Sequence, residues 1–247
     1  MESKSALFIP FALILSSCAS LGRGYMSILL GSEPNDIPYE KIVDFSIPKY
    51  DGFYFVDGYS NGGTFNCTWS KDCAEINGGE LRMSVKKEGK RYFGAEFRSP
   101  KWFGYGYYCA KMKAAPCSGV ISSFFLYTHT PVWDEIDIEI LGKDMRAVQF
   151  NYYVNGNGNH GYLYKLPYDA SKEYHEYGFH WLKDSITWYI DGLPVYKAYD
   201  TILPSHKQNL MANVWNCIGF PGWSGEMDDS SLPVTASYRY FGYSPAE

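Results

Sequence analysis

Three acidic residues alternate with aliphatic residues in the segment from Trp133 to Gly142. With a period of two, one face of a β-strand carries Glu135, Asp137 and Glu139, and the other face carries three isoleucines. Like charges on one face repel one another and lose hydration free energy when they are covered. The alternative is a solvated edge strand that bears charges against aggregation, but mixed charge or lysine would serve that purpose better. The pattern therefore favours catalysis by carboxyl groups.

Two carboxyl groups on either side of a glycosidic bond commonly catalyse its hydrolysis, one as acid and the other as nucleophile or as base for water. Glu135 and Glu139 are four residues apart, so their Cα atoms lie about 13 Å apart on a strand. If the side chains lean together, the carboxyl groups approach the ~5.5 Å of a retaining pair, although an inverting separation also remains open. We expect Asp137 to hydrogen-bond to one glutamate and to raise the proton affinity of its neighbours. The three groups would then titrate as a coupled set with the acid protonated near neutral pH.

The composition agrees with a carbohydrate-binding cleft in one large domain. The 247 residues are enough for a single domain with a substantial core. Aromatic residues make up 18% of the chain, and their ring faces can stack on the apolar faces of pyranose sugars. The net charge of −5 argues against nucleic acid as a partner.

The elements that must position the acids are short β-strands. Turn signals recur along the chain after residue 51, including Asn61-Gly62-Gly63, Asn77-Gly78-Gly79 and Asp191-Gly192. Short alternating or β-rich runs lie between them, and the run from Ile186 to Ile190 before Asp191-Gly192 predicts a hairpin. Helical periodicity is hard to find. We therefore expect an all-β sandwich of antiparallel sheets.

The N-terminus is typical of an export signal. Residues 1–18 contain Lys4, an apolar stretch that is too short to span a bilayer, and a final Cys18. The end of this segment resembles a bacterial lipobox, in which Cys18 is lipidated, and an ordinary signal peptide cut near Ala19 is the alternative. We predict a cell-envelope lipoprotein whose membrane contact is the lipid at Cys18, or else a fully secreted protein. Residues 19–45 are expected to be a tether with an entering strand, and residues 46–247 the catalytic domain.

Five cysteines follow Cys18. An exported protein can form disulfides, but an odd number leaves one thiol unpaired. The short spacings within Cys67/Cys73 and Cys109/Cys117 suggest local bridges, with Cys217 as the fifth cysteine, although spacing does not fix the connectivity. No histidine lies near a cysteine at ligand spacing, so we expect no zinc site.

The segment from Asp134 to Gly142, with the sequence Asp-Glu-Ile-Asp-Ile-Glu-Ile-Leu-Gly, resembles the signature of glycoside hydrolase family 16 and of its bacterial lichenases. Those enzymes are endo-1,3-1,4-β-D-glucan 4-glucanohydrolases. Supporting segments follow in the same order over roughly residues 51–244, among them Asp57 to Trp69, Gly119 to Phe125 and Asn213 to Asn216. The resemblance implies a concanavalin A-like jelly roll with an open cleft for a polysaccharide. We expect a monomer that requires no cofactor.

The resemblance also implies roles for single residues. By position, Glu135 would be the nucleophile, Glu139 the general acid/base and Asp137 an auxiliary group between them. Trp133 would flank the cleavage point. Glucosyl units on the non-reducing side would contact Asn61, Glu96 and Arg98. The other expected cleft residues are Phe65, Tyr127, Asn151, Tyr153, Asn213, Trp215 and Trp223. The choice between core and cleft stays open for Phe124, Phe125 and Tyr152, and each of the other residues could also be a core aromatic or a turn residue.

The spacing of the acids discriminates among related substrates. Laminarinases of the family usually carry one extra residue before the second glutamate, whereas this chain has the unbulged Glu-x-Asp-x-Glu form. Plant xyloglucan endotransglycosylases share that form but lack the Asn61-Gly62-Gly63 region as it stands here. Mixed-linkage glucan is therefore the expected substrate. A β-1,3-glucanase, a xyloglucan-active enzyme and a surface glycan-binding protein without catalysis are the alternatives, and the intact acids argue against the last.

Three features depart from the family pattern. Lichenases commonly pair the cysteine that matches Cys67 with a cysteine where this chain has Gly94, so that bridge cannot form. The family often binds a structural calcium through an aspartate, and Arg239 puts a cation at the matching position, which argues against calcium by this route. The segment from Thr128 to Val132 is shorter than in typical lichenases, and we expect it to reshape the cleft wall beside Trp133.

Overall fold

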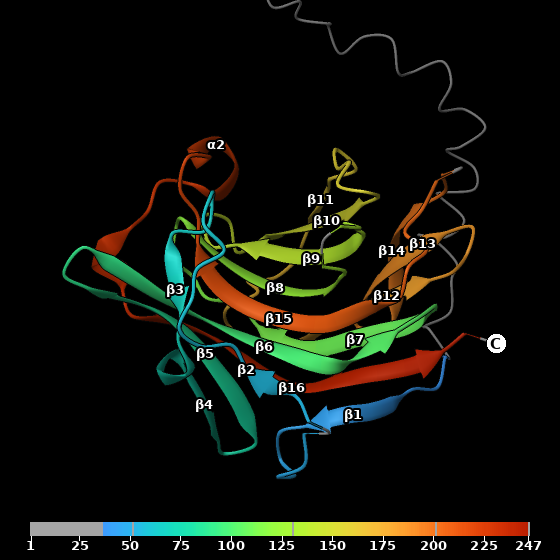
Figure 1. The fold of residues 1–247 in the computed structure, drawn as a ribbon, viewed down its shortest axis with the longest axis horizontal. Helices are drawn as coiled ribbons and strands as arrows, with labels where there is room; N and C mark the ends of the chain where they lie inside the picture. Colours follow the sequence, from blue (N-terminus) through green and yellow to red (C-terminus); the bar gives the residue numbers. More distant parts are fainter. Residues whose placement is uncertain (1–36, 51, 130, 201, 247) are drawn as a thin grey trace, which may run out of the picture.

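The computed structural model describes residues 37–50, 52–129, 131–200 and 202–246, and nearly all of its regular structure is β-strand (Figure 1). The strands of the described residues are β1 (Glu40–Asp44), β2 (Tyr54–Phe55), β3 (Cys67–Trp69), β4 (Ala74–Asn77), β5 (Glu80–Glu88), β6 (Arg91–Phe103), β7 (Gly106–Lys113), β8 (Val120–Tyr127), β9 (Glu135–Leu141), β10 (Ala147–Tyr153), β11 (Tyr162–Lys165), β12 (His175–Trp181), β13 (Ile186–Ile190), β14 (Leu193–Ala198), β15 (Gln208–Asn216) and β16 (Val234–Pro245). The helical elements are α2 (Pro221–Ser224) and the 3₁₀ turns η1 (Lys71–Cys73) and η2 (Asp229–Ser231). Within the described ranges, no helix is long and apolar enough to cross a membrane.

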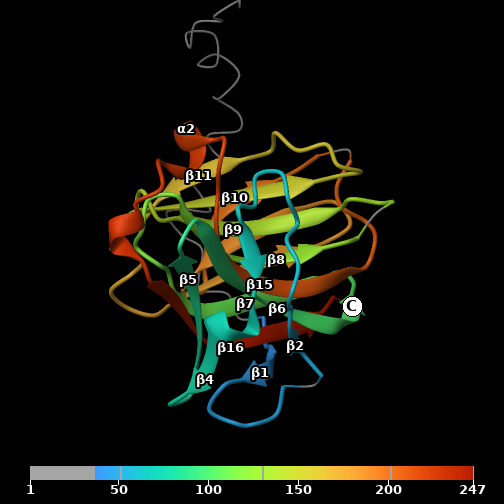
Figure 2. The same cartoon turned by 60° about the vertical axis from the view of Figure 1, so that its left-hand side comes forward.

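The strands form two curved layers that are joined at one side (Figures 1 and 2). Hydrogen-bonded neighbours follow the order β11-β10-β9-β8-β15-β6-β5-β16-β7-β12-β13-β14. Pairing along this path is antiparallel throughout. Strands from distant parts of the sequence therefore become neighbours, because β15 inserts between β8 and β6. The expected all-β sandwich of antiparallel sheets is confirmed.

Strand β9 has the two unlike faces that its sequence predicts. Ile136, Ile138 and Ile140 are fully buried between the layers, whereas Glu135 and Glu139 on the other face are half-buried. Burial of an isoleucine side chain contributes about 1.5–3 kcal/mol to the stability of the fold. A shift of β9 by one residue would place the acids in the core, so the three isoleucines fix the register of the strand.

Aromatic side chains join the layer that contains β9 to the opposite layer. The rings of Phe150 and Trp188 stack with centroids 5.6 Å apart, and Trp188 Nε1 donates a hydrogen bond to the carbonyl of Asp137 at 3.1 Å. The hydroxyl of Tyr238 on β16 donates to the carbonyl of Ser123 on β8 at 3.0 Å. Buried polar groups need such partners, because an unpaired one costs about 1–3 kcal/mol. The backbone of the acid-bearing layer is thereby tied to the layer beneath it.

The predicted hairpin at Asp191-Gly192 is confirmed. Strands β13 and β14 pair on either side of it, and both turn residues have positive φ, 47° at Asp191 and 77° at Gly192. Two consecutive residues with positive φ match the twist of antiparallel strands, and aspartate followed by glycine tolerates this conformation best.

Only part of the N-terminal prediction can be compared with the structure. Residues 1–18, including Cys18, lie outside the described residues. The strand expected at the end of the 19–45 segment is β1, and it pairs with β16 from Glu40 to Asp44. The packed sheet therefore begins before residue 46.

The suggested local disulfides are wrong: the five cysteines of the described residues are buried free thiols. Cys67 lies in a small cluster with Trp69 and Trp215, while Cys73 and Cys117 belong to the main core. The thiol of Cys109 belongs to neither cluster. Because each expected pair is divided between separate clusters or environments, closeness in sequence does not bring the sulfur atoms together. Burial raises the pKa of Cys67 to about 12 and that of Cys117 to about 11, which keeps both thiols protonated and unreactive.

Candidate active site

The floor of the site consists of side chains that the antiparallel register places side by side on the concave layer. Glu139 is paired with Ser123 on β8, and Glu135 is paired with Tyr127. Each acid begins a row that continues onto β8, β15 and β6. The three rows are Glu139–Ser123–Asn213–Glu96, Asp137–Phe125–Met211–Arg98 and Glu135–Tyr127–Asn209–Trp102, and in the last row Asn209 and Trp102 lie outside the cleft lining. Four strands from three separate parts of the sequence thus build one continuous surface.

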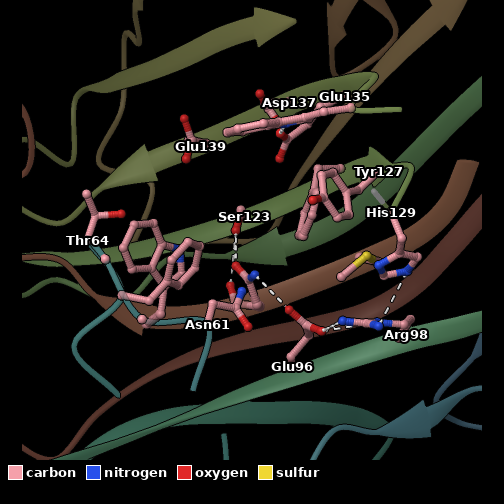
Figure 3. Close-up of a pocket in the computed structure, with 18 of the residues that line it drawn as sticks. Asn61, Thr64, Glu96, Arg98, Ser123, Tyr127, His129, Glu135, Asp137 and Glu139 are labelled. Atoms are coloured by element: carbon pink, nitrogen blue, oxygen red, sulfur yellow. Dashed lines mark hydrogen bonds and ion pairs between the residues drawn. The ribbon is translucent and has the colours of Figure 1, made fainter. Parts of the chain in front are cut away.

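This surface is the floor of a cleft of about 540 Å³ (Figure 3). Figure 3 shows the three acids along β9, facing Glu96 and Arg98 on the other side of the cleft. Most of the residues singled out in the sequence line it, and these are Asn61, Phe65, Glu96, Arg98, Tyr127, Trp133, Glu135, Asp137, Glu139, Asn213 and Trp215.

Three other predicted residues, Asn151, Tyr153 and Trp223, are not among the residues that line the cleft. They lie beside the acids or the lining residues. Asn151 is the cross-strand partner of Asp137, and the ring of Tyr153 stacks on Trp133 with centroids 5.3 Å apart. Nε1 of Trp223 donates to Oε1 of Gln149 at 2.9 Å, and Nε2 of Gln149 donates to Glu139 at 3.3 Å. Trp223 therefore orients an amide that holds the second glutamate.

Several lining residues were missed in the sequence, namely Tyr59, Gly62, Gly63, Thr64, Ser123, His129 and Met211. Ser123 and Met211 had a usable signal, because they alternate with period two along strands that already carry expected cleft residues. The residues on loops had no such signal. Of the residues left open between core and cleft, Phe125 lines the cleft, while Phe124 and Tyr152 belong to the core.

The three acids do not share the same tendency to ionise. Burial raises the pKa of Glu135 to about 7, against hydrogen bonds from Trp133 and Asp137 that lower it. Burial and the charge of Glu135 raise the pKa of Glu139 to about 8. Burial and the two neighbouring glutamates hold the pKa of Asp137 well above its usual range. At neutral pH the set therefore carries fewer than three charges, and Glu135 ionises before Glu139.

The expected role of Asp137 needs a correction. We expected Asp137 to hydrogen-bond to one glutamate, which is confirmed for Glu135, and to raise the proton affinity of its neighbours, but the pKa of Asp137 itself is held well above its usual range. A protonated carboxyl is a hydrogen-bond donor, and its bond to Glu135 lowers the pKa of that glutamate. The reason is that one of three adjacent carboxyls on a buried strand face must stay neutral.

The indole of Trp133 is held over the first acid. Nε1 of Trp133 donates a hydrogen bond to Oε2 of Glu135 at 2.6 Å, and the side chain remains 42% exposed at the edge of the cleft. The backbone N–H of Gly156 donates to the carbonyl of Trp133 at 2.7 Å. Gly156 has φ of 77°, and a Cβ at this position would lie 3.3 Å from the Trp133 ring. A glycine is therefore required for the loop to pass under the indole.

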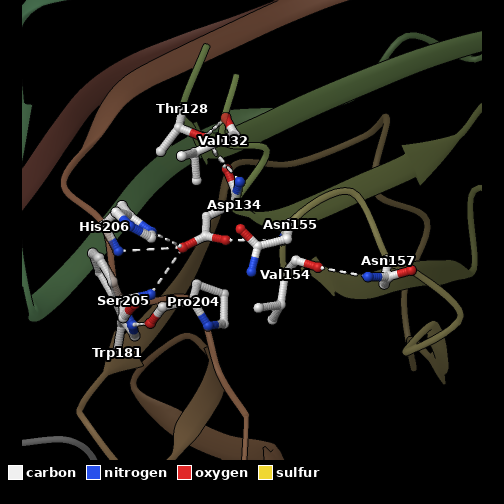
Figure 4. Close-up of polar contacts among 10 residues, drawn as sticks. All are labelled: Thr128, Val132, Asp134, Val154, Asn155, Asn157, Trp181, Pro204, Ser205 and His206. Carbon is white, nitrogen blue, oxygen red and sulfur yellow. Dashed lines mark hydrogen bonds and ion pairs between the residues drawn. The ribbon is translucent and has the colours of Figure 1, made fainter. Parts of the chain in front are cut away.

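Asp134, between Trp133 and Glu135, anchors this end of β9 (Figure 4). Its fully buried carboxylate accepts hydrogen bonds from the backbone N–H groups of Asn155, Ser205 and His206 at 3.0–3.2 Å. Nδ1 of His206 lies 2.9 Å from the same carboxylate. Burial would raise the pKa of Asp134, but these hydrogen bonds outweigh it and lower the pKa below its usual value. One carboxylate thus joins two loops to the start of β9.

The short segment before Trp133 is closed by its own hydrogen bonds. Oγ1 of Thr128 donates to the carbonyl of Val132 at 2.6 Å, and it accepts from the backbone N–H of Asp134 at 2.8 Å. His129, which follows Thr128, is half-buried and lines the cleft. These two hydrogen bonds connect Thr128 to Val132 and Asp134.

The side of the floor that lies opposite the acids carries a buried ion pair. Glu96 is almost fully buried and lies 2.5 Å from Nη2 of Arg98. Nδ2 of Asn213 donates to the second carboxylate oxygen at 3.2 Å, and Ser123 hydrogen-bonds to the amide oxygen of Asn213. Tyr59 accepts from Arg98 at 3.3 Å. A sugar hydroxyl that enters here would meet oriented donors and acceptors.

Within the described part of the chain, no group of three or more His, Cys, Asp or Glu side chains is arranged to hold a metal ion. The guanidinium of Arg239 lies over the ring of Tyr174 at 4.0 Å. This is the position where the resemblance would place a calcium-binding aspartate.

Comparisons with known proteins agree with the geometry of the cleft. Residues 61–232 match the model of glycosyl hydrolases family 16. A xylanase/β-glucanase of Ruminococcus flavefaciens is 42% identical over 214 residues, which are 82% of this chain but only 26% of that protein. A β-glucanase of Paenibacillus macerans is 44% identical over 192 residues, covering 76% of this chain and 80% of that protein. The crystal structure of a β-1,3-1,4-glucanase (lichenase) from a mouse hindgut metagenome is 44% identical, has a TM-score of 0.78, and covers 83% of this chain and 98% of that chain.

Proposed function

The chain belongs to glycosyl hydrolases family 16, and from this membership and its cleft we infer that it is an endo-acting, retaining hydrolase of mixed-linkage 1,3-1,4-β-D-glucan. The observation that carries the inference is the row of Glu135, Asp137 and Glu139 on the floor of an open cleft. The relatives named β-glucanase and lichenase support the choice of substrate. An open cleft suits an internal cut in a polymer, because the chain can enter and leave at both ends.

The proposed reaction proceeds in two displacements. The carboxylate of Glu135 attacks the anomeric carbon, and the bond between that carbon and the glycosidic oxygen breaks. Glu139 gives its proton to the departing oxygen, and a glycosyl ester of Glu135 remains. Glu139 then takes a proton from water, whose oxygen attacks the anomeric carbon and frees Glu135 with net retention of configuration.

The proton affinities of the set support these roles. A nucleophile must be ionised and an acid must be protonated before the first step. Glu135 has the lower pKa, about 7, and Glu139 the higher, about 8. The hydrogen bonds from Trp133 and Asp137 favour the ionised form of Glu135, so the neighbours promote the required distribution of protons.

Export and lipidation at Cys18 form a second part of the proposal. They rest on the apolar N-terminal segment and its final cysteine. Metabolic labelling with radioactive palmitate should label the parent protein and leave a Cys18→Ala variant unlabelled. Equal labelling of both would refute lipidation at this residue. The proposed enzyme needs no cofactor, so extensive dialysis against a chelator should leave its activity unchanged.

The substrate is tested by the release of reducing sugar from barley mixed-linkage β-glucan, laminarin and xyloglucan. Each polymer is incubated with the parent and with Glu135→Gln. We expect turnover of mixed-linkage glucan only, and its loss in the variant. Turnover mainly of laminarin or xyloglucan would keep the chemistry but overturn the substrate. Tight binding without hydrolysis of any polymer would show a glycan-binding protein instead of an enzyme.

A further inference from the structure

Trp102 lies outside the cleft lining but next to it. It is near the end of β6, is 50% exposed, and is paired across strands with Asn209 of β15. Its ring meets that of His129 edge to face, with centroids 6.1 Å apart. His129 itself lines the cleft. Trp102 and His129 therefore form an exposed aromatic pair that continues the cleft beyond its lining.

A β-bulge in the pairing of β6 with β15 sets the direction of the Trp102 side chain. The pairing of β6 with β15 shifts between Asn209 and Met211, so that Trp102 and Arg98 face residues only two apart on β15. Bulges of this kind redirect side chains, and they are common beside functional sites. The hydroxyl of Ser99 closes the bulge, because it donates to the carbonyl of Lys101 at 2.8 Å and accepts from the backbone of β15.

The side chain of Asn209 supports the rings of both Trp102 and His129. Its buried amide nitrogen donates to the carbonyls of Ser99 and Lys101 at 3.1 and 3.0 Å, immediately before Trp102. Its side chain also hydrogen-bonds to His129. One buried amide therefore fixes the backbone under the tryptophan and the imidazole beside it. Such a surface is rigid before any ligand arrives, which lowers the entropic cost of binding.

The pair is continuous with the catalytic cleft. The His129 ring also contacts Tyr127, with centroids 5.2 Å apart, and its Nε2 lies 3.5 Å from Nη1 of Arg98. Tyr127 in turn is the cross-strand partner of Glu135. Burial and the charge of Arg98 lower the pKa of His129, which leaves a neutral imidazole that can exchange hydrogen bonds with hydroxyl groups. Aromatic rings and polar groups thus run without a break from Glu135 to Trp102.

We propose that Trp102 and His129 form a sugar-binding platform that extends the cleft on the Arg98 side. Its ligand is a glucosyl unit of the same polysaccharide chain, whose apolar ring face stacks on Trp102 while its hydroxyl groups contact His129. The proposal rests on the inferred glucan hydrolase and adds a site distant from the cleavage point. A polymer reaches the platform, whereas a short aryl glycoside that fills only the sites near Glu135 does not.

The test compares long and short substrates in variants of one residue. Trp102→Ala should lower kcat/KM for polymeric mixed-linkage glucan on the order of fivefold, the loss of one aromatic contact. It should leave kcat/KM for a short aryl β-glucoside of the same linkage unchanged. Trp102→Phe keeps a ring and should retain most of the activity on the polymer. Tyr199→Ala removes an exposed ring that follows β14, outside the cleft lining, and should leave both substrates unaffected.

Binding is measured separately from turnover by affinity electrophoresis in gels that contain mixed-linkage glucan. Glu135→Gln should be retarded, and the double variant with Trp102→Ala should be retarded less. Equal retardation of the two, or an equal loss on long and short substrates, would overturn the platform. A parent protein that hydrolyses no glucan but shows retardation dependent on Trp102 would refute the hydrolase and keep the platform. A parent that neither binds nor cleaves any glucan would refute both.

Discussion

The floor and the rim of the cleft are positioned by different forces. On the floor, Glu135, Asp137 and Glu139 take their places from the hydrogen-bonded register of β9 with β8 and β10. On the rim, loops are placed by single side chains that bind backbone groups, as Asp134 does for two loops at the start of β9. A floor side chain can therefore be changed without moving its neighbours, whereas a rim anchor cannot.

The contrast separates chemistry from placement. Substitution on the floor should change rate or pH dependence while stability stays nearly constant. Substitution of a rim anchor should change stability and substrate affinity together, because the backbone loses the partner that holds it. Variants of both kinds, measured side by side, test whether the division is real.

The largest effect is expected for Glu135, the proposed nucleophile on the floor. Glu135→Gln should lower kcat by about 10⁴-fold or more, because no covalent intermediate can form. Its melting temperature should equal or exceed that of the parent, since a charge among like charges is removed. Initial rates on mixed-linkage glucan and calorimetric melting give both quantities.

Glu139→Gln is the matched control for that loss. It should lower kcat on the polymer by roughly 10²–10⁴-fold, and an aryl glycoside with a good leaving group should recover the first step because it needs no proton. Equal recovery in Glu135→Gln would reverse the roles of the two glutamates. A fall in stability in either variant would argue that floor residues also hold the backbone.

The rim anchor should show the opposite behaviour. Asp134→Ala leaves three backbone N–H groups without an acceptor, which should cost about 3–5 kcal/mol and lower the melting temperature by roughly 10 °C. kcat should also fall, because Trp133 is adjacent. Thermal melting with parallel kinetics measures both losses, and full stability in the variant would contradict the proposed anchor.

The anchor also has a pH signature. Because the pKa of Asp134 is held below its usual value, its contribution is present above the unfolded pKa and is lost as the pH falls through the folded value. The parent should therefore lose stability below about pH 4. Asp134→Ala should lack this component of the acid-induced loss.

The auxiliary acid of the floor should affect pH dependence more than rate. The parent should show a bell-shaped kcat/KM, which falls as the pH drops through about 7, where Glu135 takes up a proton, and as it rises through about 8, where Glu139 loses one. These limits belong to the coupled set. Asp137→Ala removes the hydrogen bond that lowers the pKa of Glu135, so the acidic limb should move to higher pH, with about tenfold lower activity at the optimum.

Asp137→Asn controls for the loss of the donor. Its amide still donates to Glu135, so the acidic limb should stay close to that of the parent. A downward shift of the limb in Asp137→Ala would mean that Asp137 carries a charge in the free enzyme and raises the pKa of Glu135.

The floor could be predicted from sequence, because a strand has a fixed period. Alternation from Trp133 to Gly142 placed the acids on one face and the isoleucines in the core, as the structure confirms. The same rule would have found Ser123 and Met211 if applied to β8 and β15. The order of strands could not be read from local periodicity, since β15 lies between β8 and β6 only in three dimensions.

The loop residues of the rim, the state of the cysteines and the ionisation of the acids could not be predicted from the sequence, for physical reasons. Tyr59 and His129 lie on loops, where no repeat relates sequence to direction. The disulfide expectation failed because sequence spacing says nothing of the clusters that separate Cys67 from Cys73. The expected effect of Asp137 on the proton affinity of Glu135 was wrong because ionisation depends on the burial of all three acids together.

The smallest effect tests the rim where it also binds substrate. Oδ1 of Asn61 accepts a hydrogen bond from Nε1 of the fully buried Trp69 at 2.9 Å, and Asn61 lines the cleft. Asn61→Ala should cost about 1 kcal/mol of stability and raise KM for mixed-linkage glucan roughly threefold to fivefold. Lys90→Ala, in the exposed turn between β5 and β6 and outside the lining, should leave KM unchanged.

Trp69→Phe separates placement from contact at this position. It removes the donor that orients the amide but keeps Asn61 itself. If the rim works by placement, Trp69→Phe should raise KM nearly as much as Asn61→Ala, and the double variant should add little to either. Additive increases in KM would instead mean that Asn61 acts only through its own contact with the sugar. The distinction between a floor set by register and a rim set by anchors would then not hold for this loop.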